Sequence, residues 1–387
     1  MECVKGRPQP FGVEIRKDHI NFAVQVPTGK KCELLLYKKG SMNPKYRFEM
    51  PEEKGIGEVR FLALQGLDTE KYEYNFQIDE RVWIDPYVRE LAGTKKFGVR
   101  MDVQKHQARG KFVRDAYDWE DDKRPHLAWN DVIAYSLHIR GFTKHSSSHA
   151  VHKGTYLGIV EKIPYLLQLG INQIQCMPVY EFDECAKAKI NYWGYGPSYL
   201  YAVKSAYASH GEMSAESEFK TLVKELHRAG IECIPELYFT GKELPGEIVS
   251  VLRYWVEEYH VDGFHLLGFP NLLLAAEDPF LKRTKLFAEN WNEVMDRRPK
   301  KGYITPGDGP VSVAEKNLAE YNMQFMEDMR RFLKGDEGML QAFEFRNRRN
   351  PAEYAVVNYM ANTNGFTLMD AVSYDRKHNE KNGEENR

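Results

Sequence analysis

From about Asn130 onward the chain repeats one pattern, a short apolar run followed by an amphipathic stretch. Residues 214–230 begin with a serine cap, carry apolar residues at helical spacing and end at a glycine, which predicts a helix. Residues 231–239, IECIPELYF, then have the composition of a buried strand. Strands that alternate with helices form parallel sheets. The number of units favours an α/β fold of the (β/α)8 TIM-barrel type over an open doubly wound sheet.

The first hundred residues have a different pattern, because short bursts of alternating apolar and polar residues are separated by turn-rich segments. We therefore expect a small β-sandwich over residues 1–105 and the barrel over residues 106–387. The charged, glycine-containing segment 91–125 lies across this boundary. We interpret it as an exposed crossing segment, and a binding arm is the alternative.

The charge balance excludes several kinds of partner. Among 387 residues, 54 Lys and Arg face 56 Asp and Glu, for a formal net charge of −2. A broad cationic surface for nucleic acid or an anionic membrane is therefore not expected, and an uncharged partner is favoured. No apolar run is long enough to span a bilayer, and the N-terminus lacks the apolar region of a signal peptide. Together with five scattered cysteines, this predicts a cytoplasmic protein with reduced thiols.

The sequence predicts neither a cofactor nor a metal site. Residues 194–199, GYGPSY, come nearest to a dinucleotide-binding loop, but they lack the third glycine and open no helix. The spacing of His145, His149 and His152 would allow metal binding, yet no matching carboxylate or cysteine pair accompanies them. We therefore interpret this segment as a polar loop.

In a parallel barrel, catalytic side chains lie at the carboxyl ends of the strands. The candidates there are His138, Arg140, Glu236, Tyr238, His265, Leu267, Glu289, Asn362 and Asn364. Few of them are carboxylates, although retaining glycosidases need two. The aromatic loop 192–199, YWGYGPSY, could form a stacking surface for a sugar, and a packed aromatic cluster is an equal alternative.

These segments together resemble glycoside hydrolase family 13, in its isoamylase, glycogen-debranching and type I pullulanase group. PFGVEIRKDHINFAVQVP and YEYNFQIDERVWIDPYVREL are similar to the carbohydrate-binding module family 48 sandwich that precedes those barrels. VIAYSLHIRGFTKHSSSHAVHKGTYLGIVEKIPYLLQLGINQIQCMPVYEFDE resembles the first βα unit and second strand, and NYWGYGPSYLYAVKSAYAS resembles the aromatic loop. GDEGMLQAF and NGFTLMDAVSYDRKHNEKNGEEN resemble late segments of the group.

The same resemblance shows where the catalytic motifs differ. The family's fourth strand ends in a VDGFRFD-type motif whose Asp is the nucleophile, and here VDGFHLL places Leu267 at that position and His265 at the arginine. The third-strand motif, DVVFNH in the family, is ELYFTG, with Glu236 in place of the Asp. The late HD pair is Thr363 and Asn364, so the transition-state stabiliser loses its charge.

The general acid of the family matches Glu289 in LFAENWN, 22 residues after Leu267, a spacing that leaves room for only a short helix between them. The resemblance also implies that Tyr192, beside Trp193 and Tyr195, stacks on sugar, with His265 and Asn364 as further binding residues.

Three hypotheses follow. The favoured one is a non-catalytic relative of debranching enzymes that binds α-glucan such as glycogen, starch or maltooligosaccharide, with an active glycosidase or a second copy of itself as a possible partner. The second is an active α-1,6-glucan hydrolase with Glu289 as acid and base and an unorthodox nucleophile, for which Glu236 is the candidate. The third is an interaction protein without sugar affinity. The resemblance further implies a barrel that lacks its eighth strand, which indicates either closure by other means or a longer parent protein.

Overall fold

The computed structural model describes residues 1–100, 102–114, 117–186, 189–291, 317–363, 368–378 and 380. The chain divides into two compact units, described separately below. The first comprises Met1–Asp262 with Gly268–Pro270, and the second comprises Gly263–Leu267 with Asn271–Arg387. No helix among these described ranges is long and apolar enough to cross a membrane.

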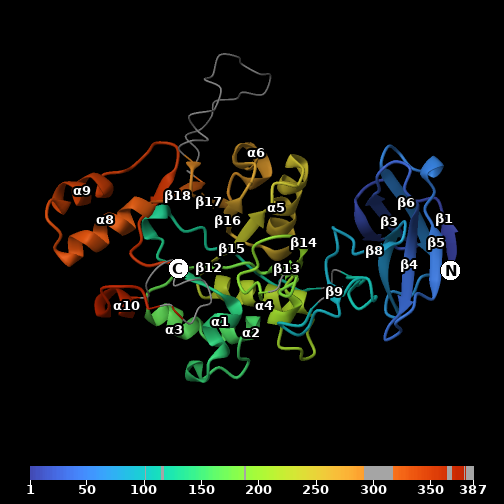
Figure 1. Ribbon diagram of the computed structural model, residues 1–387, viewed down its shortest axis with the longest axis horizontal. Helices are drawn as coiled ribbons and strands as arrows, with labels where there is room; N and C mark the ends of the chain where they lie inside the picture. Colours follow the sequence, from blue (N-terminus) through green and yellow to red (C-terminus); the bar gives the residue numbers. More distant parts are fainter. Residues whose placement is uncertain are drawn as a thin grey trace, which may run out of the picture. The chain divides into compact units, whose positions relative to one another are not determined.

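The first unit begins with two antiparallel sheets that enclose a hydrophobic core, drawn in blue in Figure 1. Phe22, Leu34, Leu36 and Phe76 are fully buried between the sheets, as the alternating pattern of their strands predicts. One sheet has the order β1-β6-β3-β2, with β1 (Glu2–Val4), β2 (Gly12–Ile15), β3 (His19–Gln25) and β6 (Val59–Gln65). The other has the order β5-β4-β7-β10-β9, with β8 on β7, and comprises β4 (Cys32–Lys38), β5 (Tyr46–Glu49), β7 (Tyr72–Ile78), β8 (Arg81–Trp83), β9 (Leu91–Ala92) and β10 (Arg109–Gly110).

The prediction that residues 91–125 form an exposed crossing segment is wrong at two short strands and the residues beside them. Strands β9 and β10 lie within this segment and pair with each other, and Gly110 pairs with Tyr74 of β7. Ala108 is buried in a small core beside them. The predicted boundary at residue 105 stays a prediction.

The first unit continues with three parallel strands, β11 (Ala134–Leu137), β12 (Gln173–Cys176) and β15 (Glu232–Phe239). Helix α4 (Ala215–Arg228) is capped by Ser214, whose side chain accepts a hydrogen bond from Ser217 N at 3.0 Å, and Gly230 follows it at φ 74°, as predicted. The remaining elements are α1 (Ile139–Lys144), α2 (Tyr156–Val160), α3 (Ile163–Gln168), the antiparallel pair β13 (Tyr180–Phe182) and β14 (Ser198–Val203), and α5 (Pro245–Tyr259).

The amphipathic pattern of residues 154–170, which ends at a glycine, predicts one helix, but the structure has the two short helices α2 and α3 instead. Pro164 stands at the start of α3 and has no N–H to donate to the preceding turn, so a continuous helix would lose a hydrogen bond here.

The second unit contains four parallel strands, β16 (Gly263–Gly268), β17 (Lys285–Ala288), β18 (Leu318–Tyr321) and β19 (Ala355–Val357). Its helices are α6 (Leu272–Glu277), α8 (Met323–Lys334), α9 (Met339–Asn347) and α10 (Leu368–Ser373). Helix α6 has only six residues, which agrees with the short helix expected between Leu267 and Glu289. The described residues thus supply seven parallel strands, consistent with the predicted barrel class.

Candidate functional site

His138 organises the end of the first parallel strand. It follows β11 directly and is the N-cap of α1, because its Nδ1 accepts a hydrogen bond from Gly141 N at 3.0 Å. Its other ring nitrogen, Nε2, lies 3.0 Å from the carbonyl oxygen of Tyr192. With Nδ1 as acceptor, Nε2 carries the proton and donates to that carbonyl. Burial lowers the pKa of His138 below its ordinary value of 6.5, so the ring is neutral at pH 7.

Tyr192 and Trp193 form an aromatic surface beside this histidine. The Tyr192 ring is stacked on the His138 imidazole, with centroids 4.2 Å apart and planes 13° apart. Trp193 meets Tyr192 edge-on at 5.2 Å and is 43% exposed, whereas Tyr192 is half-buried. Phe97 contacts Tyr192 at 6.0 Å and lies under the guanidinium of Arg140. The structure therefore brings two of the predicted binding residues together on a partly open surface.

Tyr195, the third predicted binding residue of the loop, has a different partner. Its hydroxyl donates to Glu236 Oε2 at 2.8 Å, and its ring lies 5.5 Å from that of Tyr238. Glu236 is 5% exposed and belongs to the interior of β15, three residues before its end. The tyrosine thus occupies one oxygen of the only carboxylate in the third-strand motif.

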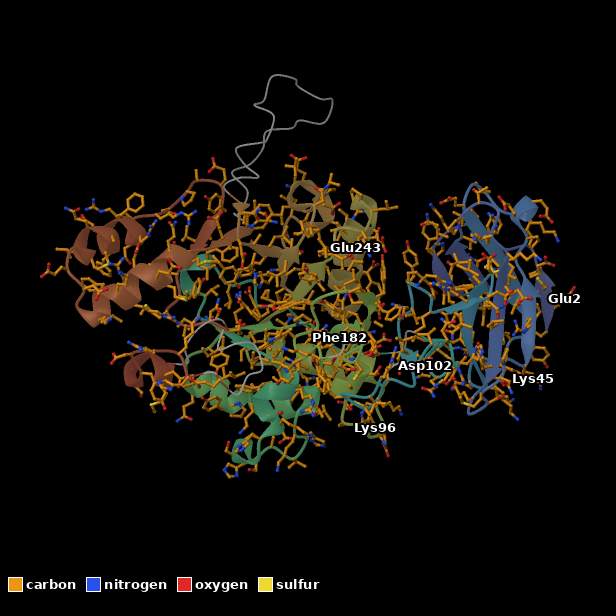
Figure 2. All side chains as sticks on the ribbon, in the orientation of Figure 1. Glu2, Lys45, Lys96, Asp102, Phe182 and Glu243 are labelled. Atoms are coloured by element: carbon orange, nitrogen blue, oxygen red, sulfur yellow. The ribbon has the colours of Figure 1, made fainter. Side chains whose placement is uncertain are left out.

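The rest of that motif turns toward a neighbouring glutamate. Thr240 Oγ1 donates to Glu243 Oε1 at 2.9 Å, and Gly241 N donates to Oε2 at 3.0 Å. Partial burial would raise the pKa of Glu243, but these hydrogen bonds hold it below its usual value. Glu243 is labelled in Figure 2. The loop is therefore closed by its own hydrogen bonds.

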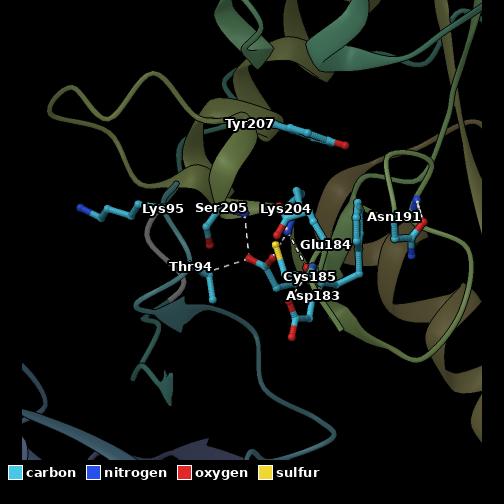
Figure 3. A network of polar contacts seen from close by, with 12 residues as sticks. Thr94, Lys95, Asp183, Glu184, Cys185, Asn191, Lys204, Ser205 and Tyr207 are labelled. Carbon is cyan, nitrogen blue, oxygen red and sulfur yellow. Dashed lines mark hydrogen bonds and ion pairs between the residues drawn. The ribbon is translucent and has the colours of Figure 1, made fainter. Parts of the chain in front are cut away.

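A buried ion cluster anchors the hairpin β13–β14, which carries the aromatic loop (Figure 3). Lys204 Nζ lies 2.6 Å from Glu181 Oε1, 2.8 Å from Glu184 Oε1 and 2.6 Å from the carbonyl of Phe182. Thr94 donates to the second oxygen of Glu181 at 3.1 Å. Burial raises the pKa of Glu184. The ammonium therefore ties both carboxylates to the end of β14.

In the second unit, Leu267 and Glu289 occupy corresponding positions on neighbouring strands. His265 of β16 and Phe287 of β17 are register partners. Leu267 comes two residues after His265, and Glu289 comes two residues after Phe287. Leu267 is half-buried and Glu289 is exposed directly after β17.

The remaining candidates of this unit lie on later strands. The ring of His265 is 4.6 Å from that of Tyr321 on β18. Burial, and then the charge of Glu289, raise the pKa of Tyr359. Thr363 and Asn362 are exposed, and Asn364 lies outside the described residues.

Several residues around the aromatic surface could not be predicted from the sequence. Phe97 stands alone in a charged segment, and only its contacts with Tyr192 and with Tyr207, stacked at 6.3 Å, reveal its place. The hydrogen bond between His138 and the carbonyl of Tyr192 also has no sequence signal, because the two residues are 54 positions apart. Aromatic side chains beside strand ends were the one available signal.

The comparisons with known proteins agree with this architecture. No protein-family model matches the chain. It is 30% identical to the chloroplastic isoamylase 3 of Oryza sativa over 98% of its own length and 60% of that protein. It is 28% identical to the glycogen operon protein GlgX homolog of Haemophilus influenzae, over 99% of its length and 69% of that protein. The chain thus spans about 60% of the plant relative's length.

Solved structures give the same fold. The catalytic module of SpuA, a glycogen-degrading pneumococcal virulence factor, superposes with a TM-score of 0.72 over 98% of this chain and 66% of that one, at 17% identity. The pullulanase of Paenibacillus barengoltzii, in complex with maltohexaose and α-cyclodextrin, superposes with a TM-score of 0.62 over 83% of this chain and 58% of that one, at 17% identity.

The fold therefore places the chain in the same barrel-type class as these solved structures. More specifically, its relatives are isoamylases, glycogen-debranching enzymes and pullulanases, and the resemblance to the debranching group of glycoside hydrolase family 13 is confirmed.

Proposed function

We propose that this chain binds α-glucan and does not hydrolyse it. The pairing of Leu267 with Glu289 carries the proposal. A retaining glycosidase needs two carboxyl groups about 5 to 5.5 Å apart across the sugar, one as nucleophile and one as acid and base. At the end of β16 and directly after β17, this chain has one isobutyl group and one carboxylate. Leucine can neither attack the anomeric carbon nor stabilise the positive charge of the transition state.

The third-strand residues do not compensate for this loss. Glu236 is buried in the middle of β15 and accepts a hydrogen bond from Tyr195. Thr240 and Gly241 stand where the family motif has Asn and His, and both donate hydrogen bonds to Glu243. An active α-1,6-glucan hydrolase that uses Glu289 as acid and base would need a nucleophile from elsewhere.

The aromatic surface supports the binding half of the proposal. The ring planes of Tyr192 and Trp193 are 85° apart, so the edge of one ring meets the face of the other. The apolar face of a pyranose buries well against such rings. A formal charge of −2 on 387 residues suits a neutral polysaccharide. Two of the matched proteins carry glycogen in their names, which agrees with glycogen, starch or maltooligosaccharide as the ligand.

A glucan-binding chain without hydrolysis would act through another protein, and an active glycosidase or a second copy of this chain is the partner we propose.

The five cysteines are all free, with three of them buried, which suits a reducing compartment such as the cytoplasm.

Calorimetric titration with maltoheptaose tests the binding half directly. The proposal expects saturable binding to one class of sites. Absence of binding to maltoheptaose and to glycogen would leave the interaction protein without sugar affinity as the correct hypothesis.

A further inference from the structure

His138 holds Tyr192 by two contacts of different kinds. Its ring lies parallel to the tyrosine ring at 4.2 Å, and its Nε2–H donates to the tyrosine's own carbonyl at 3.0 Å. The side chain is 8% exposed, so it is largely covered by the groups that it holds. One imidazole thereby fixes both the backbone and the ring of Tyr192.

Gly141 completes the support from the other side. A Cβ built at this position would lie 2.6 Å from the hydroxyl oxygen of Tyr192, so only glycine lets the tyrosine approach the first turn of α1. The N–H of the same glycine donates to His138 Nδ1 at 3.0 Å. Tyr192 thus rests in a cradle made by His138 and Gly141.

We propose that His138 is the positioning residue of the glucan-binding surface, and that Tyr192 can stack on a sugar only while this imidazole is neutral. The inference rests on the proposed glucan binding, and it assigns the control of that surface to a residue that touches no sugar itself.

The protonation state follows from the hydrogen bonds. A second proton would have to sit on Nδ1, where the N–H of Gly141 already points, so two donors would face each other. That proton would break the N-cap of α1 and displace the imidazole on which the Tyr192 ring is stacked.

Four groups from the packed elements face the imidazole. They are Arg140 of α1, Glu236 of β15, the ring of Tyr192 and the hydroxyl of Tyr207, which lies 3.1 Å from Nε2. Burial and the charge of Arg140 lower the pKa of His138, and Glu236 acts against them. Because the folded pKa is lowered, we expect binding to be complete at pH 7 and to be lost as the pH falls through a value below 6.5.

Three variants separate the contacts of the cradle. His138→Phe keeps a ring and loses both hydrogen bonds, and His138→Gln keeps an amide donor and loses the ring and the titration. Gly141→Ala favours the helix but drives its Cβ into the Tyr192 hydroxyl, so a loss of binding there does not come from a weakened helix. His145→Gln, in the exposed loop after α1, is the matched control.

Binding of maltoheptaose is measured from pH 5 to pH 8. We expect His138→Phe and Gly141→Ala to bind about three- to tenfold more weakly at pH 7, the effect of one or two lost hydrogen bonds or their equivalent. His138→Gln should retain part of the affinity and lose the acid step seen in the wild type and in His145→Gln. Unchanged affinity in all three variants, or an acid step that survives His138→Gln, would overturn the inference while glucan binding stands.

A ligand-free measurement keeps the two proposals distinguishable. 5-Fluorotryptophan is incorporated at the six tryptophans. The ¹⁹F resonance of Trp193 reports on the cradle, since the centroid of its ring lies 6.2 Å from that of His138. The resonance of buried Trp255 reports on the fold. The inference expects the Trp193 resonance to titrate with His138 and to move in the cradle variants, while that of Trp255 stays in place. If the wild type binds no glucan, the proposed function fails, and an unmoved Trp193 resonance would overturn the positioning role as well.

Discussion

Leu267 lies near the end of β16 and Glu289 directly follows the parallel strand β17, each two residues beyond the register pair of His265 and Phe287. Adjacent strands lie about 4.8 Å apart. The ends of neighbouring strands can therefore bring two carboxyl groups about as close as a retaining glycosidase requires. In this chain Leu267 places an isobutyl group at one of the two strand ends, so only Glu289 supplies a carboxylate at this pair of positions.

Restoring the fourth-strand motif should not restore turnover. In the double variant Leu267→Asp with His265→Arg, the third-strand positions Thr240 and Gly241 remain bound to Glu243. The sequence also keeps Asn364 where the family has a carboxylate. We expect no release of reducing ends from pullulan or glycogen by this variant. Measurable turnover would show that Thr240, Gly241 and Asn364 do not by themselves prevent hydrolysis.

Loss of the stacking ring should weaken glucan binding. Tyr192→Ala removes the ring held on His138 and is expected to cost about 1 to 3 kcal/mol of binding free energy by calorimetry with maltoheptaose. Tyr165→Ala is the matched control, because this tyrosine of α3 is 45% exposed and its ring contacts Phe142. Equal affinities of the two variants would remove Tyr192 from the site.

The buried ammonium of Lys204 should be important for stability. Lys204→Met leaves Glu181 and Glu184 without their shared cation, and we expect the free energy of unfolding to fall by about 3 to 5 kcal/mol. Lys242→Met, in an exposed loop, should change it little. Urea unfolding of both variants checks this, and equal midpoints would show that the carboxylates do not depend on Lys204.

A second buried cluster predicts a pH dependence of stability. His227 lies 2.8 Å from Asp122 and 3.0 Å from Asp262, and although burial acts in the opposite direction, these two carboxylates raise the pKa of His227 above 6.5. A raised folded pKa gives stability that is complete below pH 6.5 and is lost as the pH rises through the folded pKa.

Asp122→Asn should therefore reduce the free energy of unfolding by about 3 to 5 kcal/mol near pH 6 and less at higher pH. Urea unfolding from pH 6 to pH 9 measures this difference. A wild-type stability that rises steadily over the same range, with no effect of Asp122→Asn, would contradict the assigned role of the cluster.

The sequence predicted those parts of the fold that depend on local patterns. The cap at Ser214, the stop at Gly230 and the alternation that buries Phe22 each depend on neighbouring residues. The break between α2 and α3 was not predicted, because the apolar spacing of a helix continues through Pro164. The proline nevertheless explains the break, since it has no N–H to donate.

The candidate site was predictable only in part, for a related physical reason. The short connection between Leu267 and Glu289 followed from chain length alone. In contrast, the support of Tyr192 comes from Phe97, His138 and Tyr207, which are distant in sequence and carry no common pattern. Contacts of this kind are fixed by tertiary packing.

The most direct test of the central claim is the release of reducing ends during incubation of the purified chain with glycogen, pullulan and maltooligosaccharides. We expect no release in proportion to protein, and no difference between the wild type and Glu289→Gln, at concentrations where calorimetry shows maltoheptaose bound. Reducing ends that increase with the amount of wild-type protein and vanish in Glu289→Gln would contradict it, and would show that this barrel still hydrolyses α-glucan.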